Sequence, residues 1–376
     1  MAKMSGRERL LRVFRQQETD RMPIWLWGVD PMFKSNRPSW APLYEMVEKY
    51  DLEIMRSWSP RPKPRPKDVP PPPPGPERMQ AERPDMWEYH RKIKTPKGDL
   101  TQIYYAPKDG SPGYVVKDYI KTPEDAEKWL SLPHKITEPD IETDSYFELL
   151  EKTGDRTIIM IGVGEAMYSI EAMMGSESFG IFIMDEPELL HEMIGRAYER
   201  VENLVKFYLA HDVGDYYGWV GPELCIPPLA SPKHFRDFVS RYDKPIIDLV
   251  HDAGKLVWVH CHGDMKPVLE DFVQMGVDCL NPIEPPPIGG LTLAEAKEVV
   301  NGRMTLDGGV QNGWFDTMEP HEMEEAVEEI ISMGKPGGCY IYGQTSDPGT
   351  WVSLSEKHLA NFKVFVETAV RLREYD

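Results

Sequence analysis

The segment Lys255-Leu-Val-Trp-Val-His-Cys-His-Gly263 ends a run of strand-forming residues with two histidines one residue apart. Side chains alternate across an extended strand, so His260 and His262 are predicted to share one face while Cys261 points to the other. Two imidazoles at the carboxyl end of a strand can polarise a substrate or supply half of a metal site. They can also be hydrogen-bonded histidines with no chemical role, and the remaining sequence has to distinguish these cases.

Composition and charge restrict the possible classes of protein. The chain has 376 residues, of which 41% are hydrophobic, enough for a large core. Its net charge of −19 disfavours nucleic acid and anionic membranes as partners. No apolar run approaches the ~20 residues of a membrane span, and the N-terminus lacks a signal-peptide hydrophobic region. We expect a cytoplasmic protein whose cysteines are buried thiols or ligands and form no disulfide framework.

Predicted strands and helices alternate along most of the chain. Strands are expected at 22–27, 51–58, 157–163, 215–220, 255–261, 277–281, 303–307 and 338–342. Alternation of this kind is typical of parallel βαβ units. We therefore predict one α/β domain over residues 1–376, a (β/α)8 TIM barrel preceded by an amphipathic N-terminal helix at 4–18. The chemistry of such a barrel lies at the carboxyl ends of its strands, the barrel mouth.

Residues 60–120 interrupt this alternation. Eleven of the 25 residues from Pro60 to Pro84 are proline, which excludes a helix or a central strand there. Residues 86–120 then have the pattern of a β-hairpin. We predict a proline-rich and hairpin insertion near the barrel mouth, with an SH3-type ligand as the alternative for the prolines.

Polar side chains gather at the predicted strand ends. A single carboxylate there often caps a helix or is solvated, as expected of Asp264. The combination of His260, His262 and Glu284 with a cysteine is more informative, because imidazole, carboxylate and thiolate together suit tetrahedral Zn²⁺. Zinc in an open site could polarise a substrate oxygen. The other polar residues at these ends are Asp30, Glu165, Glu223, Cys225, Asp307, Gln311, Asn312 and those from Cys339 to Gln344.

Aromatic and methionine side chains are concentrated in the same region. Most are expected in the core, but some could line an apolar pocket for a flat ring. The catalytic residues that we predict are Glu223, His260 and His262. The predicted substrate-binding residues are Trp27, Asp30, Met167, Tyr216, Trp219, Asp307 and Gln311.

Several segments, in order, resemble the uroporphyrinogen decarboxylase superfamily. They include Arg7-Glu-Arg-Leu-Leu, Asp20-Arg-Met-Pro-Ile-Trp25, Val259-His-Cys-His-Gly-Asp264, Gly276-Val-Asp-Cys-Leu-Asn-Pro282 and Leu306-Asp-Gly-Gly-Val-Gln311. The resemblance runs from about residue 5 to the C-terminus, interrupted by the proline-rich segment. It implies a (β/α)8 barrel.

Within that superfamily the chain is more similar to the corrinoid-dependent methyltransferases. Decarboxylases carry paired arginines and a Gln-Ala-Gly run soon after the first strand, whereas this chain has Trp25-Leu-Trp-Gly-Val-Asp30 there. The methyltransferases hold zinc through an H-x-C-G motif, a downstream carboxylate in some relatives and a late cysteine. The resemblance places His260 at the motif histidine and His262 at its cysteine, and implies Glu284 and Cys339 as further ligands. Aligning Gly337-Gly338 instead places Gln344 or Thr345 at the last position.

The resemblance implies a methyltransferase that moves a methyl group between a small O-methylated substrate and the cobalt of a corrinoid protein. The substrate could be a methoxylated aromatic. Histidine in place of cysteine makes the site harder, which favours an oxygen substrate over a thiol. Zinc, or a proton donor such as Glu223, would polarise the ether oxygen. Cobalamin would be carried by the partner protein. The converse reaction, methyl transfer from the corrinoid to tetrahydrofolate or a thiol, is left open. The chain could form a homodimer.

Two other functions are compatible with the sequence. One is a decarboxylase acting on a small carboxylate substrate, with Asp30 as its central carboxylate. The other is a non-enzymatic scaffold that recruits a partner through the proline-rich segment. The crowded polar rim argues against the scaffold, because burying that many charges without chemistry costs stability.

Overall fold

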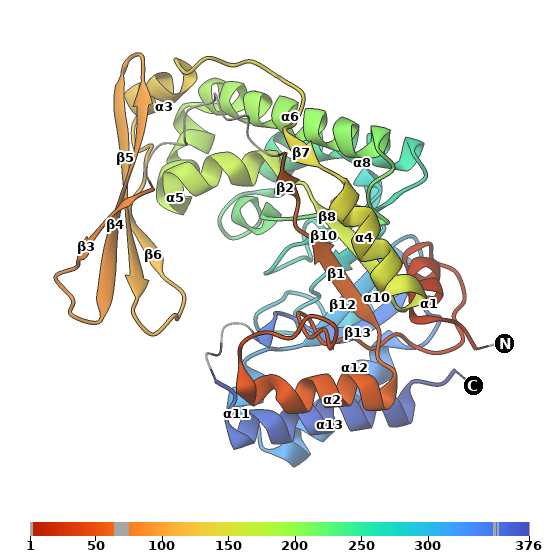
Figure 1. Cartoon of the computed structure of the whole chain (residues 1–376). Coiled ribbons are helices and arrows are strands. Elements are labelled where there is room, and N and C mark those ends of the chain that lie inside the picture. Colours follow the sequence, from red (N-terminus) through yellow and green to blue (C-terminus); the bar gives the residue numbers. More distant parts are fainter. Residues whose placement is uncertain (1–2, 64–74, 349–350, 352, 376) are drawn as a thin grey trace.

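A curled parallel sheet forms the centre of the molecule (Figure 1). The computed structural model describes residues 3–63, 75–348, 351 and 353–375. The seven strands of the sheet follow one another in the order β1-β8-β9-β10-β11-β12-β13, and all their pairings are parallel. They are β1 (Ile54–Trp58), β8 (Thr157–Gly162), β9 (Tyr216–Val220), β10 (Leu256–His260), β11 (Cys279–Asn281), β12 (Thr305–Val310) and β13 (Tyr340–Gln344).

The segment predicted as the first strand, 22–27, connects the two edges of this sheet without forming a regular strand. The N–H of Trp25 donates to Tyr342 on β13, and the N–H of Glu53, next to β1, donates to the carbonyl oxygen of Ile24. These contacts are isolated parallel bridges. Pro23 has no N–H to extend the ladder, and the chain turns at Gly28, where φ is +71°. Of the eight strands that the sequence predicted, seven are present in the parallel sheet, and the remaining one, at 22–27, is reduced to bridging residues.

Helices cover the outer face of the sheet. Each contacts the next around the molecule: α6 with α8, α8 with α9, α9 with α10, α10 with α12, and α12 with α13, which also contacts α2. No helix among the described residues is long and apolar enough to cross a bilayer. The helices are α1 (Gly6–Phe14), α2 (Ala41–Tyr50), α3 (Pro123–Leu130), α4 (Asp144–Thr153), α5 (Ala166–Asp185), α6 (Pro187–Ala210), α7 (Pro232–Phe235), α8 (Arg241–Asp252), α9 (Leu269–Met275), α10 (Leu293–Val300), α11 (Trp314–Thr317), α12 (Pro320–Gly334) and α13 (Glu356–Leu372).

The insertion is a four-stranded antiparallel sheet, larger than the predicted hairpin. It contains β3 (Glu77–Gln80), β4 (Met86–Thr95), β5 (Gly98–Pro107) and β6 (Tyr114–Lys117), in that order, and stands apart on one side of the molecule (Figure 1). The short strands β2 (Arg61–Pro62) and β7 (Ile141–Glu142) pair at its root. The chain enters it from the carboxyl end of β1. The proline run from Pro70 to Pro74 lies outside the described residues.

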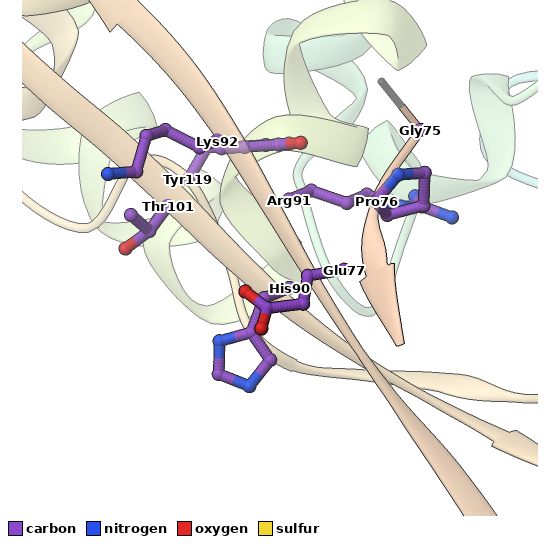
Figure 2. Close-up of a pocket in the computed structure, with 8 residues that line it drawn as sticks. All are labelled: Gly75, Pro76, Glu77, His90, Arg91, Lys92, Thr101 and Tyr119. Atoms are coloured by element: carbon purple, nitrogen blue, oxygen red, sulfur yellow. The ribbon is translucent and has the colours of Figure 1, made fainter. Parts of the chain in front are cut away.

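The inserted sheet has a hollow of its own, of about 580 Å³ (Figure 2). Its walls include side chains of β4, such as His90 and Arg91, and Tyr119 from the return segment. The sheet is joined to the rest of the molecule at α5, where the N–H of Ile120 donates to the carbonyl oxygen of Met173. At that point α5 kinks at Gly175 (φ +71°), and a Cβ there would collide with the carboxylate of Asp118. Glycine is therefore required where the insertion and α5 meet.

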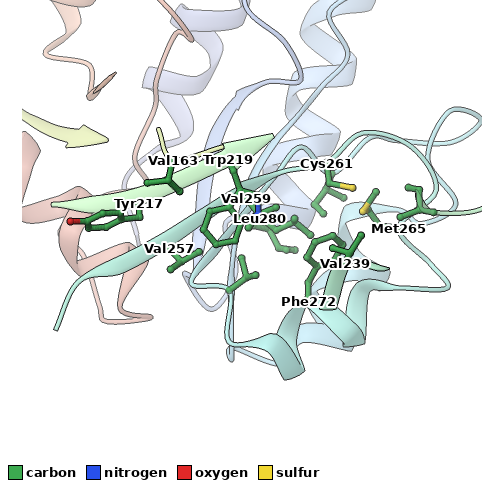
Figure 3. Packing of buried hydrophobic residues seen from close by; sticks show 14 of the residues in the cluster. Val163, Tyr217, Trp219, Val239, Val257, Val259, Cys261, Met265, Phe272 and Leu280 are labelled. Carbon is green, nitrogen blue, oxygen red and sulfur yellow. The ribbon is translucent and has the colours of Figure 1, made fainter. Parts of the chain in front are cut away.

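Two apolar layers fill the space on either side of the parallel sheet. Side chains that point outward, such as Val257, Val259 and Cys261, pack against the helices (Figure 3). Side chains that point inward, such as Tyr216, Trp258 and Ile341, form a second cluster. Leu10, Val13 and Phe14 of α1 belong to this inner cluster, so α1 closes the amino end of the curled sheet.

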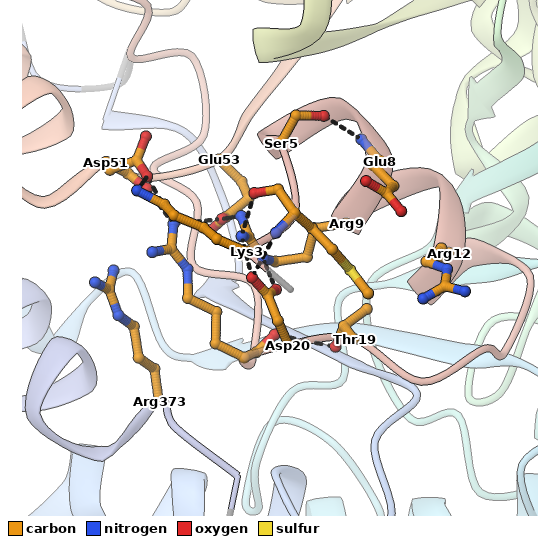
Figure 4. A network of polar contacts seen from close by, with 12 residues as sticks. Lys3, Ser5, Glu8, Arg9, Arg12, Thr19, Asp20, Asp51, Glu53 and Arg373 are labelled. Carbon is orange, nitrogen blue, oxygen red and sulfur yellow. Dashed lines mark hydrogen bonds and ion pairs between the residues drawn. The ribbon is translucent and has the colours of Figure 1, made fainter. Parts of the chain in front are cut away.

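A network of ion pairs surrounds the same amino end (Figure 4). Arg9, only 1% exposed, pairs with both Asp20 and Glu53, and Arg21 also pairs with Glu53. Glu53 in addition accepts a hydrogen bond of 2.7 Å from the N–H of Ile24. The network ties α1 to the bridging segment and to the start of β1.

Candidate functional site

Two imidazole rings meet edge to face at the carboxyl end of β10. His260 is the last residue of that strand and His262 follows it, with ring centroids 4.5 Å apart and perpendicular planes. Cys261 is fully buried in the outer apolar cluster. The alternation that the sequence predicted for this segment is thus present in the fold.

The protonation of His260 is set by its neighbours. Its Nδ1 lies 2.7 Å from Oδ1 of Asn281, and the amide nitrogen of Asn281 donates to the carbonyl oxygen of Asp307. Oδ1 of Asn281 is therefore an acceptor, and Nδ1 of His260 carries the proton. Burial, and to a smaller extent the neighbouring His262, lower the pKa of His260 to about 4. His260 is neutral at physiological pH, with Nε2 as an acceptor.

Glu284 is held in its ionised form beside the second ring. Its Oε1 lies 3.2 Å from Nδ1 of His262 and accepts from Gln311 at 3.0 Å, while Oε2 accepts from the N–H of Gly263 at 2.7 Å. Burial alone would raise the pKa of Glu284, but the bonds from His262, Gln311 and Gly263 outweigh it and lower the pKa. Gln311 is itself fixed, since its Oε1 accepts from the Thr345 hydroxyl at 2.9 Å.

Glu223 has the opposite tendency to Glu284. It lies in the short turn Pro222–Cys225 after β9 and accepts from the N–H of Gly221 at 3.1 Å. Burial raises its pKa, and the attraction of His262 offsets this only in part. No lysine or arginine in the described part of the chain forms an ion pair with Glu223 or Glu284. Two carboxyl groups whose pKa values are pushed apart can serve as acid and base in one site.

Indole rings line the site next to His260. Trp27 stands edge-on to the His260 ring at 4.9 Å and stacks on Trp25 at 5.5 Å. Trp258 lies parallel to His260 at 5.8 Å. Of the predicted substrate-binding residues, Trp27 is therefore in direct contact with the histidine pair and is partly exposed. It offers an apolar surface to a bound ring.

Asp307 lies beneath the indole rings of Trp25 and Trp258, inside the curled sheet. It is fully buried and accepts hydrogen bonds from the indole N–H groups of Trp25 at 2.8 Å and Trp258 at 3.2 Å. Burial raises the pKa of Asp307 to about 7 although these bonds favour the ionised form. Asp307 was predicted to contact the substrate directly, but in the structure it orients the two indole rings that line the site.

Four other predicted substrate-binding residues are not at the histidine pair. Asp30 is paired with Arg56, whose guanidinium also lies over Phe33. Met167 and Trp219 point outward into the helical layer, where Trp219 donates to Asp243 at 2.9 Å. Tyr216 points inward but at the amino end, against Phe14. Trp219 and Tyr216 are three residues apart on one strand and so lie on opposite faces.

Cys339 is at the wrong end of its strand to join the predicted metal ligands. It precedes β13 in a turn where Gly337, Gly338 and Cys339 have φ of +74°, +66° and +51°, whereas His260 ends β10. Parallel strands place these two points at opposite ends of the sheet. Within the described residues no group of three or more His, Cys, Asp or Glu side chains is arranged to hold a metal ion. Cys339 therefore lies apart from His260, His262 and Glu284.

Several residues of the site were not among the predicted ones. Asn281 sets the tautomer of His260, Trp25 and Trp258 hold Asp307, and Arg56 neutralises Asp30. Asn281 could have been found, because a polar residue inside a buried three-residue strand needs a partner. Gln344, the alternative ligand position, is fully buried, and both of its amide atoms lack hydrogen-bond partners.

The fold and this site define a class: an α/β enzyme with a parallel barrel-like sheet and its polar cluster at the strand carboxyl ends. The model of the uroporphyrinogen decarboxylase (URO-D) family matches residues 101–369. The chain belongs to the uroporphyrinogen decarboxylase family.

Comparison with solved structures agrees with this fold. A methyltransferase from Methanosarcina mazei is similar over 97% of this chain and 98% of its own, with a TM-score of 0.59 and 14% identity. A B12-independent methionine synthase from Shewanella sp. W3-18-1 is similar over 74% of this chain and 73% of its own, with a TM-score of 0.44 and 10% identity. No curated protein sequence matches the chain. At these identities the likeness shows the fold alone.

Proposed function

We propose that this protein is a methyltransferase that moves a methyl group from a small O-methylated substrate, such as a methoxylated aromatic, to the cobalt of a separate corrinoid protein. One observation carries the proposal. Glu223, a carboxyl group with a raised pKa, interacts electrostatically with His262, whose ring contacts that of His260 beside the partly exposed indole of Trp27. Membership of the family and the fold shared with a methyltransferase support the reaction class.

The reaction needs a proton on the leaving oxygen. The methyl–oxygen bond breaks, the methyl carbon passes to the Co(I) centre of the corrinoid as co-substrate, and the oxygen leaves as a phenol or alcohol. In the proposed mechanism Glu223 gives its proton to that oxygen, because an alkoxide or phenolate is otherwise a poor leaving group. His262, held by Glu284, would return a proton to Glu223, with which it interacts electrostatically. Trp27 would hold the aromatic ring, and His260 would accept a hydrogen bond at Nε2.

Zinc on His260 and His262 stays a prediction, and no step above depends on it. The complete eight-stranded barrel is also part of the proposal, with the segment Pro23–Trp25 in the position of the eighth strand. So is a single domain over residues 1–376, in which 60–120 form an insertion beside the mouth. Elemental analysis of the purified protein and of the His260→Ala and His262→Ala variants tests the metal.

Exposed apolar side chains support docking of a protein partner over the carboxyl end. The exposed apolar residues here are each at least 39% exposed: Val220 ends β9, and Phe33, Leu229 and Ile288 lie on segments that follow the central strands or the bridging residues. Pro227–Ser231 and the end of α5 also line a hollow of about 300 Å³. Such patches are typical of interaction surfaces. A corrinoid protein docked here would bring its cobalt to the histidine pair.

The test uses purified protein, a panel of methoxybenzoates and free cob(I)alamin in place of the carrier. We expect methylcobalamin and the matching phenol to form in equal amounts, and Glu223→Gln to lower the rate by about 100-fold or more. Glu325→Gln, on the exposed face of α12, is the matched control and should act like wild type. Absence of methyl transfer from every ether would refute the proposal. A fully active Glu223→Gln would refute the role of Glu223.

The decarboxylase alternative has less support. It requires Asp30 as a free central carboxylate, and Asp30 is instead paired with Arg56 at the rim. Release of CO₂ from a small carboxylate without any corrinoid would favour it over methyl transfer.

A further inference from the structure

Two carboxyl groups are buried together in the helical layer beside β9, and the proposed mechanism uses neither of them. Glu165, at the N-cap of α5, is 1% exposed, and Asp243, in the first turn of α8, is 4% exposed. A side-chain hydrogen bond joins the two groups, and no lysine, arginine or histidine in the described part of the chain forms an ion pair with either. Ionised carboxylates only accept hydrogen bonds, so the pair must hold a proton.

The surrounding hydrogen bonds assign this proton to Asp243. One oxygen of Glu165 accepts from the N–H of Met167 at 2.9 Å, and the other accepts from the N–H of Tyr168. Two such donors at the start of a helix favour the ionised form of Glu165. Oδ2 of Asp243 accepts from the indole N–H of Trp219 at 2.9 Å, which leaves Oδ1 to donate to Glu165. Burial raises the pKa of Asp243 well above its usual range, and the charge of Glu165 raises it further.

The pair fixes the turn that carries Glu223 from two sides. The ring of Tyr168, in the first turn of α5, lies against Gly221, where a Cβ would come within 2.3 Å of Cγ of Tyr168. Gly221 also has φ of +125°, so only glycine fits there, and its N–H donates to Glu223 at 3.1 Å. The indole that donates to Asp243 lies on β9, two residues before Gly221. The hydrogen bond between Glu165 and Asp243 therefore joins both supports of this turn.

The negative charge of the pair also acts on Glu223. The charges of Glu165 and Glu223 repel each other, so an ionised Glu165 disfavours the ionisation of Glu223. Cys225 and Cys261 also interact with Glu165, but burial raises the pKa values of both thiols and keeps them neutral. Glu165 thus favours the protonated form that an acid at Glu223 requires.

We propose that Glu165 and Asp243 share one proton, which Asp243 carries, and that the two are positioning residues for Glu223. They fix the turn Pro222–Cys225, and neither contacts the substrate. The role given to Glu223 rests on the proposed function, whereas the shared proton does not.

Amide substitutions test the position of the proton. Asp243→Asn keeps every hydrogen bond, because its oxygen can accept from Trp219 and its nitrogen can donate to Glu165. Glu165→Gln has only one acceptor oxygen for the two N–H groups of α5, so its amide nitrogen meets a donor. We expect Asp243→Asn to unfold at the same urea concentration as wild type and Glu165→Gln to unfold at a lower one. The reverse order would overturn the assignment.

Infrared spectroscopy detects the shared proton directly. The C=O stretching band of one protonated, buried carboxylic acid should be present in wild type and missing in Asp243→Asn. Glu319→Gln is the matched control, because Glu319 occupies the N-cap of α12 but is exposed, and it should keep the band. A band that persists in Asp243→Asn would overturn the proposal.

Amide hydrogen exchange and kinetics test the positioning of Glu223. In Glu165→Gln the amide of Gly221 should exchange about tenfold faster or more, and kcat with methoxybenzoate and free cob(I)alamin should fall about tenfold or more at little change in KM. Asp243→Asn and Glu319→Gln should match wild type in both measurements. Lower stability of Glu165→Gln with Gly221 exchange and kcat unchanged would make the pair purely structural and overturn the positioning role. If wild type transfers no methyl group, the proposed function fails, and the infrared band and the exchange of Gly221 still decide this inference.

Discussion

The two ends of the parallel sheet both contain buried charged side chains, but the partners of these charges differ. At the amino end the buried carboxylate of Glu53 faces two guanidinium groups, those of Arg9 and Arg21. At the carboxyl end Glu223 and Glu284 face an imidazole and backbone amides instead, and the pKa of Glu223 is raised while that of Glu284 is lowered. The amino end is arranged for stability. Carboxyl groups with shifted pKa values and no basic partner are what a reaction needs, and Glu223 and Glu284 at the carboxyl end are of this kind.

The largest effect is expected from breaking the amino-end network. Arg9→Met would leave Glu53 buried with part of its charge uncompensated and should lower the free energy of unfolding by ~3–5 kcal/mol. Urea unfolding measures this. Arg12→Met is the matched control, because Arg12 lies on the same helix and makes only an exposed bond to a carbonyl oxygen. A loss below about 1 kcal/mol would mean that the network contributes little to stability.

The next effect concerns the carboxyl end and should appear in activity. His260→Ala removes the neutral imidazole and its acceptor Nε2, and we expect the methyl-transfer rate to fall by about 100–1,000-fold. The free energy of unfolding should change by less than about 2 kcal/mol, because the substitution leaves one small cavity and the ring makes a single side-chain hydrogen bond, to Asn281. The exposed His321 gives the matched control, His321→Ala. If His260→Ala unfolds as readily as Arg9→Met while retaining its activity, the contrast between the two ends fails.

A third, smaller effect distinguishes Asp307 from the paired carboxylates of the amino end. Its pKa is raised from 3.8 to about 7, so the folded state binds the proton more tightly than the unfolded state. Its contribution is then fully present below pH ~4 and is lost as the pH rises through ~7. Asp307→Asn should flatten the stability–pH curve over that window. The exposed-site variant Asp185→Asn should leave the curve unchanged, and an equal slope in both variants would contradict the prediction.

The local sequence pattern was sufficient to predict most of the parallel strands and the shared face of the two histidines. Strand periodicity located the seven parallel strands to within a few residues, and alternation placed His260 and His262 together with Cys261 turned away. Both follow from the geometry of one strand, which the sequence encodes directly. The same alternation applied to β9 would have separated Tyr216 from Trp219.

Contacts between distant segments could not be predicted in this way. The pairing of Asp30 with Arg56 joins a loop to strand β1, and no sequence pattern records the spacing between them. The bond from Asn281 to His260 depends on the register of β10 and β11, in which these two residues are partners. The predicted last strand began at 338, whereas β13 begins at Tyr340, and this shift of two residues leaves Cys339 in the preceding turn. Even the predicted bounds put Cys339 near the amino end of its strand, and it was the resemblance to a late cysteine that made it a candidate ligand.

The smallest effect is therefore expected from Cys339→Ser. The thiol is half-buried, lies at the amino end, and has its pKa raised by burial, with Lys297 as its nearest charged influence. Serine also tolerates the left-handed conformation of this turn about as well as cysteine, so unfolding should change by no more than about 0.5 kcal/mol. Methyl transfer and any bound zinc, measured by elemental analysis beside His262→Ala, should equal those of wild type. Loss of metal or activity on Cys339→Ser, with unfolding unchanged, would require the amino end to communicate with the histidine pair, and the separation of a stabilising end from a reactive end would no longer hold.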